Sequence, residues 1–447
     1  MYKGLRNRPG QSSLRFIKEN LNFSNLWINT REAIKGSEKD FTTEKLGLAI
    51  FLLSVPMVLE MLMESVFAVV DIFFVSRLGA DAVATVGITE SLMTIVYSLG
   101  VGLGTATTAL VSRRIGEKNP EGAAIAAVQS IFAGISISFL ISIPGILYAP
   151  KILGLMGVSE EIIRSHGGYT TIMLGGNVVI MLLFIINAVF RSAGDAAVSM
   201  RVLWLANIIN IVLDPCLIFG LGPFPELGVM GAAIATNIGR GIAVIYQFYL
   251  LFRGKKRVQI LWKHVRLRIA VLKKLIHLSM GGIGQSLIAT SSWIGMVRII
   301  SVFGSEVMAG YTIAIRIIIF SILPSWGLSN AASTLVGQNL GAKKPERAER
   351  AVWLTASINM TLMGILALFF IFFPEFFMRI FIDELPVIAS GVTCLRYLGY
   401  GFVLYALGMV TVNALNGAGD TATPTFINLF CFWLFEIPLA YILAIPL

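Results

Sequence analysis

Five carboxylic acids interrupt long apolar stretches in the first half of this chain. They are Glu60, Glu64, Asp71, Glu90 and Asp214. An ionisable group in the hydrocarbon core of a membrane costs about 2.5–3.5 kcal/mol even on the mildest scale, so each acid needs a partner or a function. Carboxylates in such positions commonly carry protons or bind small hard cations, and this is the chemistry that these residues can perform.

Three of these acids share one side of a predicted helix. Glu60, Glu64 and Asp71 are separated by four and then seven residues. At about 100° per residue, these spacings place all three within roughly 40° of one another. A stripe of three carboxylates that faces lipid is implausible, so we predict that this face lines the interior of a helix bundle or a cavity.

Asp71, Glu90 and Asp214 are predicted to lie at one depth. Each is about six residues from the outer end of its apolar stretch, or roughly 9 Å at 1.5 Å per residue. Asn210 lies one helical turn before Asp214 on the same face. Carboxylate and amide oxygens suit Na⁺, and they equally suit a proton, because clustered buried carboxylates repel one another.

The elements that carry these residues are predicted to be membrane helices. Of the 447 residues, 56% are hydrophobic and only 13% are charged. Lipid permits only helices or closed barrels, and these long stretches do not alternate as barrel strands do. We predict eleven spans, at residues 46–76, 84–111, 122–149, 168–190, 200–220, 229–252, 271–303, 306–336, 349–374, 391–415 and 425–446.

Lys and Arg predict the orientation of these spans. The loops on one side are strongly basic, whereas the other side has little beyond Arg77, Lys151, Arg164 and Arg379. The positive-inside rule therefore predicts a multi-pass protein of the inner (plasma) membrane with a cytoplasmic N-terminus. The net charge of +10 then reflects these loops rather than nucleic-acid binding.

The polar N-terminal segment 1–45 is expected to be cytoplasmic. We predict a short helix within residues 15–34, and Asp40 or Thr43 as the cap of the first span.

The second half of the chain repeats the first at an offset of 225 residues, the separation of Gly79 from Gly304. Other matched pairs are Gly102 with Gly327, Gly116 with Gly341, Lys118 with Lys343, Gly194 with Gly419 and Asp195 with Asp420. The offset spans six helices, so both copies have the same orientation, which is a known transporter plan. The predicted fold is an all-α membrane protein of two parallel six-helix repeats that form two bundles around a central cavity.

The repeat also predicts the domain boundaries. Residues 46–252 would form the N-terminal bundle, 253–270 a basic cytoplasmic linker, and 271–447 a C-terminal bundle without its last helix. We expect the source gene to encode about 30 further, mostly apolar residues, enough for a twelfth span.

In this order and on this repeat, several motifs resemble the multidrug and toxic compound extrusion (MATE) transporters, from about Asp40 to the end of the chain. The motifs are Pro56, Val70-Asp71, residues 75–79, 190–195, 210–215, 228–236 and 417–420. The resemblance implies two six-helix bundles in a V around a central cavity. It also implies export of a substrate in exchange for H⁺ or Na⁺, with no other cofactor.

The resemblance also implies a cation or proton site in the N-terminal bundle. The first-span Asp of that site matches Asp71, its fifth-span Asn and Asp match Asn210 and Asp214, and its sixth-span Thr matches Thr236. A Tyr that some members have one turn before the first-span Asp is Phe67 here, so one oxygen ligand is lost. Acids that other members use in the seventh and tenth spans are missing here, so we expect no second site.

The remaining charged residues within spans have competing roles. We expect Glu60 and Glu64 to relay protons toward the cytoplasm, unless they only satisfy neighbouring hydroxyl groups or an Arg. Phe67, Arg316 and Glu436 are candidates for the substrate cavity, and Arg316 is predicted to pair with Glu436. Arg240 and Arg298 are further cations within spans, and for Arg298 a side chain that reaches outward to the interface is the competing role.

Taken together, these patterns predict a cation-coupled antiporter that exports small organic, cationic amphiphilic compounds by alternating access. It would act as a monomer in the lipid bilayer, without nucleic acid. One alternative is a flippase for a lipid-linked saccharide, but its cavity should be basic to hold pyrophosphate, whereas this bundle is acidic. A membrane-embedded enzyme would not explain the two-fold repeat, so we predict that the chain is not an enzyme.

Overall fold

The computed structural model describes residues 23–254 and 256–444, and this part of the chain is helical, without strands. In chain order its helices are α2 (Phe23–Lys35), α3 (Leu46–Ser76), α4 (Ala80–Gly116), α5 (Pro120–Leu155), α6 (Glu160–Gly175), α7 (Asn177–Ala193), α8 (Ala196–Phe219), α9 (Val229–Arg253), α10 (Ile269–Ile300), α11 (Ser305–Gly341), α12 (Pro345–Phe372), α13 (Pro374–Arg379), α14 (Leu385–Ala418), α15 (Ala422–Asn428) and α16 (Ile437–Ala444). The 3₁₀ turns η1 (Trp262–His264) and η2 (Ser301–Phe303) flank α10, and a π-helical turn η3 (Leu429–Glu436) joins α15 to α16.

Eleven helical segments in the described residues are long and apolar enough to cross a membrane, as the sequence predicts. Helices α6 and α7 together make one of them, and α15, η3 and α16 make the last. Several helices extend beyond the predicted apolar stretches, and α5 begins at a polar cap. The Asn119 side chain accepts a hydrogen bond of 2.8 Å from the backbone amide of Gly122 at the start of α5.

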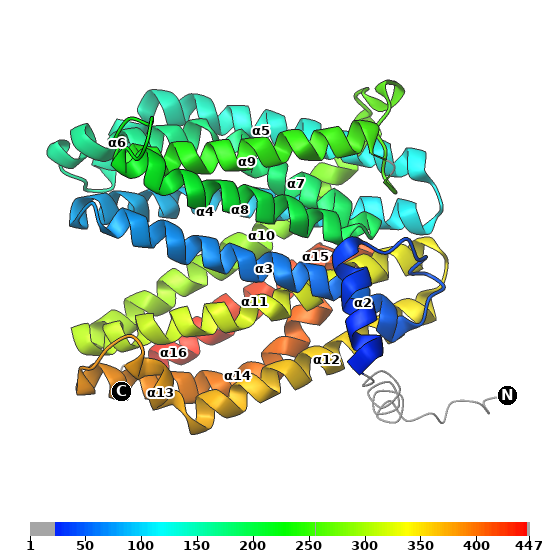
Figure 1. The fold of residues 1–447 in the computed structure, drawn as a ribbon. Helices are drawn as coiled ribbons and strands as arrows, with labels where there is room; N and C mark the ends of the chain where they lie inside the picture. The colour runs from blue at the N-terminus through cyan, green and yellow to red at the C-terminus, as the bar shows by residue number, and fades with distance from the viewer. Residues whose placement is uncertain (1–22, 255, 445–447) are drawn as a thin grey trace.

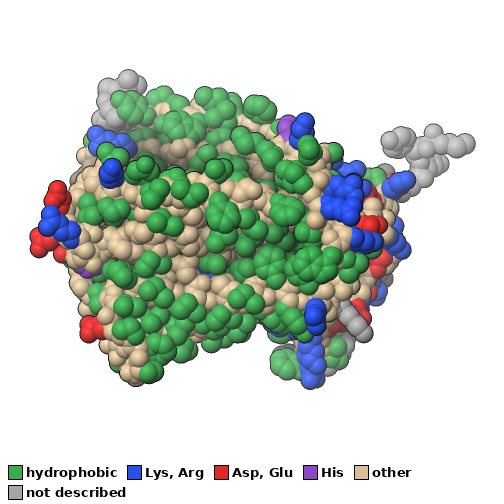
Figure 2. All heavy atoms as spheres, turned by 90° about the horizontal axis from the view of Figure 1, so that it is seen from above, with side chains coloured by type: hydrophobic (Ala, Val, Ile, Leu, Met, Phe, Trp, Pro, Cys, Tyr) green, Lys and Arg blue, Asp and Glu red, His purple; other side chains and the backbone are tan. Residues whose placement is uncertain are grey.

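The helices form two bundles, one blue to green and one largely yellow to red (Figure 1). The bundles meet at the right-hand end, where α2 lies, and diverge toward the left. Figure 2 shows Lys and Arg gathered mainly at that same end, which we call the basic end, and hydrophobic side chains along the flank. We call α3–α9 the first half and α10–α16 the second half.

The backbone repeats itself at the predicted offset. Helices α4 and α11 each have 37 residues. Gly194 and Gly419 end α7 and α14 in the left-handed region, with φ of 94° and 89°. Lys118 and Lys343 are the non-glycine residues with positive φ in the described chain, at 55° and 58°. Left-handed lysines are uncommon, so their occurrence at matched positions confirms that the halves are copies of one unit.

The two halves contact each other closely at the basic end. The Gln338 side chain of α11 donates a hydrogen bond of 2.9 Å to the carbonyl of Ser192. Gly341 lies so close to the carbonyl of Arg113 on α4 that a Cβ would overlap it. These contacts close the basic end, whereas the bundles separate toward the other end (Figure 1).

The segment before α3 crosses the basic end and is held from both sides. Arg257 of the linker donates hydrogen bonds of 2.9 and 2.7 Å to the carbonyls of Ser37 and Lys39. From the second half, Lys344 donates one of 2.9 Å to the carbonyl of Thr42, and Arg347 donates to the carbonyls of Phe41 and Glu44. We call residues 36–45 the N-terminal strap.

The predicted cap of the first span is wrong. Helix α3 begins after Lys45 without a side-chain cap. Asp40 instead accepts hydrogen bonds from the amide and hydroxyl of Thr42 at 2.9 and 2.7 Å. Burial alone would raise the pKa of Asp40, but these bonds and the charges of Lys118 and Lys344 outweigh it and lower the pKa. The helix predicted over 15–34 is described only from Phe23, as α2, because its earlier residues lie outside the described part of the chain.

Candidate functional site

Helices α8 and α9 bring three predicted site residues together. The Asn210 side-chain amide donates hydrogen bonds of 3.2 Å to Asp214 Oδ1 and of 3.0 Å to Thr236 Oγ1. All three side chains are buried. The helices approach this closely because Gly239 has no side chain; a Cβ there would lie 2.6 Å from the carbonyl oxygen of Ala206 on α8. The one-turn spacing of Asn210 and Asp214 thus produces the predicted pair.

Two oxygen atoms of this cluster have no partner. Asn210 Oδ1 and Asp214 Oδ2 are buried and accept no hydrogen bond from any described residue. Leaving a buried acceptor unpaired costs about 1–3 kcal/mol. A proton on Asp214 would convert one of these oxygens into a donor, and a small cation would bind both. The cluster therefore has the donor set that a proton or Na⁺ requires.

Asp71 and Glu90 lie around this cluster without a direct hydrogen bond to it in the described residues. Asp71 on α3 is half-buried and lies within electrostatic range of both Asp214 and Glu90. Glu90 on α4 is exposed. Tyr169 on α6 is buried within range of all three acids and was missed by the sequence analysis. Three helices thus direct carboxylates toward one region of the first half.

Glu60 is engaged in an ion pair at the far end of the predicted stripe. Arg191 Nη1 lies 2.6 Å from Glu60 Oε1, and the Asn187 amide donates a hydrogen bond of 3.4 Å to the same oxygen. At the equivalent positions of the second half, Gln285 and Asn416 exchange two amide hydrogen bonds of 3.0 Å. The same contact between helices is therefore made by charged groups in one copy and by neutral groups in the other.

Glu64 is paired with a buried arginine. Arg240 Nη2 lies 3.4 Å from Glu64 Oε1, and the Asn207 amide donates a hydrogen bond of 3.1 Å to Glu64 Oε2. The guanidinium of Arg240 also lies over the ring of Phe67, 5.5 Å from its centroid. Arg240 follows Thr236 by one helical turn, and this spacing is the signal that could have placed it at the site. Glu60 and Glu64 thus pair with arginines of the first half, whereas Asp71 lies within electrostatic range of Asp214 and Glu90.

The predicted ion pair between Arg316 and Glu436 is wrong. Within the described residues, neither side chain has an oppositely charged partner within 4.0 Å. Glu436 lies at the end of the π-helical turn η3, and η3 and α16 pack against α10 rather than α11, which carries Arg316. Arg316 is exposed and Glu436 is half-buried.

In the described part of the chain, no three His, Cys, Asp or Glu residues come together as a metal centre would require. A cation at the Asn210 cluster would therefore use amide and hydroxyl oxygens as well as the carboxylates of Asp71 and Asp214. This mixed oxygen set is typical of hard cations rather than of transition metals.

Comparisons with known proteins agree with this architecture. The MatE family model matches residues 56–216 and 282–442, once in each half. The chain is 26% identical over 395 residues to the probable multidrug resistance protein YoeA of Bacillus subtilis, covering 87% of this chain and 85% of that protein. It is 25% identical over 395 residues to the FAD transporter of Shewanella oneidensis, covering 88% and 87%.

A solved structure shares the same fold. The outward-facing conformation of a multidrug resistance MATE family transporter is 26% identical to this chain, with a TM-score of 0.84 and coverage of 90% of this chain and 89% of that one. Together with the family model, which matches most of both halves, this likeness identifies the chain. It belongs to the multidrug and toxic compound extrusion (MATE) family of membrane transporters.

Proposed function

We propose that this transporter is an antiporter that exports small organic, cationic amphiphilic compounds in exchange for H⁺ or Na⁺. The observation that carries the proposal is the buried cluster of Asn210, Asp214 and Thr236, with two unpaired acceptor oxygens beside Asp71. A transporter coupled to H⁺ or Na⁺ requires a binding site for that ion within the membrane, and this cluster has the groups for such a site.

Occupancy of this site would change the packing of the first half. Without a bound cation, Asp71 and Asp214 repel each other across a region of low dielectric constant. A proton or Na⁺ removes this repulsion and satisfies the unpaired oxygens of α8. An ion with unequal affinity for two packings of the helices shifts the population between them, and so alters the grip on substrate.

The proposed orientation follows the positive-inside rule. The basic end faces the cytoplasm, so the arrangement closed at that end is the outward-facing one. We expect the protein to act as a monomer in the inner membrane.

The relay role of Glu60 and Glu64 remains a prediction, because both carboxylates are ion-paired here. The half-buried Asp71 and exposed Glu90 favour a cationic substrate over the pyrophosphate of a lipid-linked saccharide.

Transport into vesicles under separately imposed gradients tests the proposal. Purified protein in liposomes should move a cationic dye when either a pH or a Na⁺ gradient is applied, and the effective gradient identifies the coupling ion. Asp71→Asn and Asp214→Asn should each reduce this transport to a small residual rate. Asp81→Asn is the matched control, because Asp81 is an exposed acid in the first turn of α4.

Two results would contradict the proposal. Wild-type rates in both Asp71→Asn and Asp214→Asn vesicles would leave these acids as structural groups. If a gradient drives movement of FAD but not of the cationic dye, the transporter is cation-coupled as proposed, but its substrate is anionic rather than cationic.

A further inference from the structure

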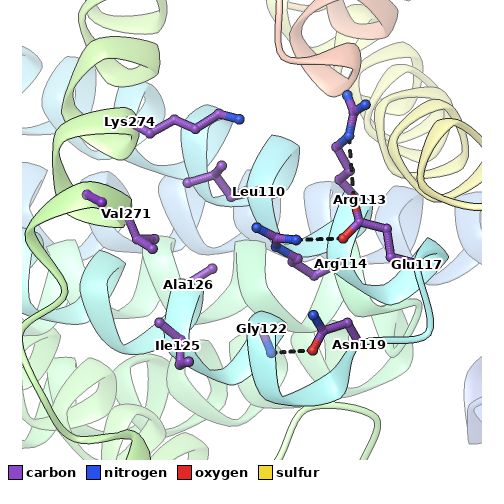
Figure 3. Close-up of a pocket in the computed structure, with 11 residues that line it drawn as sticks. Leu110, Arg113, Arg114, Glu117, Asn119, Gly122, Ile125, Ala126, Val271 and Lys274 are labelled. Carbon is purple, nitrogen blue, oxygen red and sulfur yellow. Dashed lines mark hydrogen bonds and ion pairs between the residues drawn. The ribbon is translucent and has the colours of Figure 1, made fainter.

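A cavity of about 400 Å³ lies at the basic end, outside the polar cluster described above (Figure 3). Its walls come from the end of α4, the start of α5 and the start of α10, so both halves contribute to it. The proposed transport function uses none of its residues.

The cavity carries an excess of positive charge. Arg113 and Arg114 of α4 and Lys274 of α10 line it, and Glu117 is the one acid among the lining residues. Arg114 Nη1 lies 2.7 Å from Glu117 Oε2, and Arg113 Nε lies 3.8 Å from Glu117 Oε1. Lys274 has no acidic partner within 4.0 Å in the described residues. One carboxylate for three cations leaves the cavity with a net positive charge.

The remainder of the lining is largely apolar. Leu110, Ile125 and Val271 lie on the three helices that form the walls. Figure 3 shows the Lys274 side chain extending from α10 across the cavity toward the side where α4 carries Leu110, Arg113 and Arg114. Basic groups beside an apolar wall, at the end of membrane-spanning helices, match a molecule with an anionic head and a hydrocarbon tail.

We propose that this cavity binds an anionic phospholipid of the cytoplasmic leaflet. The phosphodiester accepts hydrogen bonds from Lys274 and from the guanidinium groups of Arg113 and Arg114, and an acyl chain lies along Leu110, Ile125 and Val271. A free phosphate ion would use the basic groups and leave the apolar wall uncovered, so the apolar wall favours a lipid.

Native mass spectrometry of the full chain in detergent tests the proposal. Phosphatidylglycerol and phosphatidylcholine are offered in equal amounts, and retained lipid is counted. We expect one tightly held phosphatidylglycerol and no equivalent phosphatidylcholine. At about 1 kcal/mol per basic residue, Lys274→Gln should weaken retention about fivefold and Lys274→Glu about thirtyfold.

The adjacent Lys273 provides the matched control. It is also exposed on α10 but does not line the cavity, so Lys273→Gln and Lys273→Glu should change retention less than twofold. Excess inorganic phosphate should not displace the lipid. Equal losses in the Lys273 and Lys274 variants, unchanged retention in Lys274→Glu, or displacement by phosphate would each overturn the proposal. Size-exclusion chromatography verifies that every variant is folded.

Discussion

At the scale of single residues, the repeat allows one contact between helices to be compared in two forms, one charged and one neutral. The Glu60–Arg191 ion pair of the first half corresponds to the Gln285–Asn416 amide pair of the second. Both pairs are largely buried. A buried ion pair is expensive to desolvate and often adds little net stability over a neutral replacement, but removal of one partner leaves a buried charge.

This comparison predicts that a second substitution can restore stability lost in the first. Glu60→Gln should destabilise the protein by about 3 kcal/mol, because Arg191 loses its counter-charge. The double variant Glu60→Gln with Arg191→Asn recreates the amide pair of the second half and should recover most of that loss. The measurement is the thermal unfolding midpoint in detergent, followed by tryptophan fluorescence. A double variant less stable than Glu60→Gln would show that the two copies are not interchangeable at this position.

The polar cluster predicts non-additive losses of transport. Asp71 and Asp214 are expected to serve one site, so Asp71→Asn combined with Asp214→Asn should be no slower than the slower single variant. Initial rates of dye transport, at matched amounts of protein in the liposomes, measure this. If the fractional rate of the double variant equals the product of the fractional rates of the two single variants, Asp71 and Asp214 would instead belong to two independent sites.

Helical spacing predicted the site residues that share a helix, and the family resemblance added Thr236 from a second helix. Other residues that meet the site across helices were missed. Asn210 and Asp214 were paired correctly because a one-turn spacing fixes their contact. The position of Tyr169 beside the acids depends on how α6 is rotated and packed, which spacing alone does not determine. Arg240 lies one turn after Thr236 on α9, so its place beside Glu64 could be inferred only once Thr236 had been assigned to the site. The expected Arg316–Glu436 pair failed because η3 directs the last helix against α10.

At the scale of helices, close packing of α4 against α11 closes the basic end. Ser112 and Arg113 of α4 lie against Gly337 and Gly341 of α11, and a Cβ at either glycine would overlap α4. The length and apolar composition of these stretches predicted where the helices run. The sequence did not predict which faces of α4 and α11 pack together. Small residues on a helix indicate that another helix approaches closely, but they do not indicate which helix it is.

We predict that Gly341→Leu opens the basic end. The added side chain cannot be accommodated without moving α11 away from α4. A cysteine at the buried position Ser112, after replacement of Cys216, Cys394 and Cys431 by Ser, should then react faster with a water-soluble maleimide.

Gly401→Leu on α14 is the control for this helix packing, because nothing lies within 4 Å of a Cβ at that position. It should leave the labelling rate unchanged. Equal labelling in the Gly341→Leu variant and its parent would show that this contact does not hold the end closed.

At the scale of the whole molecule, the N-terminal strap links parts that the repeat leaves separate. Arg257 of the linker holds one part of residues 36–45, while Lys344 and Arg347 of the second half hold the rest. The carboxylate of Asp40 also lies within electrostatic range of Lys118 in the first half and Lys344 in the second. At the 225-residue offset the strap corresponds to residues 261–270, which precede α10 as the strap precedes α3. Both segments were predicted to lie outside the two bundles, so these contacts were not predicted.

Because the linker and the second half both hold the strap at the end where the two halves meet, the strap should favour the arrangement closed at that end. Arg347→Gln removes the donors to the carbonyls of Phe41 and Glu44 and should shift the population toward a conformation open at the basic end. Spin labels at the exposed positions Glu121 and Glu349, near the starts of α5 and α12, report this opening as a longer distance in double electron–electron resonance.

Arg350→Gln is the matched control for this last prediction. Arg350 lies one turn further along α12, is exposed and has Glu346 at 3.9 Å as its only acidic neighbour within 4.0 Å in the described chain. Its distance distribution should match that of the parent. A shift in Arg347→Gln alone would assign the effect to the strap, because both variants remove one positive charge from the same helix. Unchanged distributions in both would mean that the glycine contacts between α4 and α11 close the basic end without help from the strap.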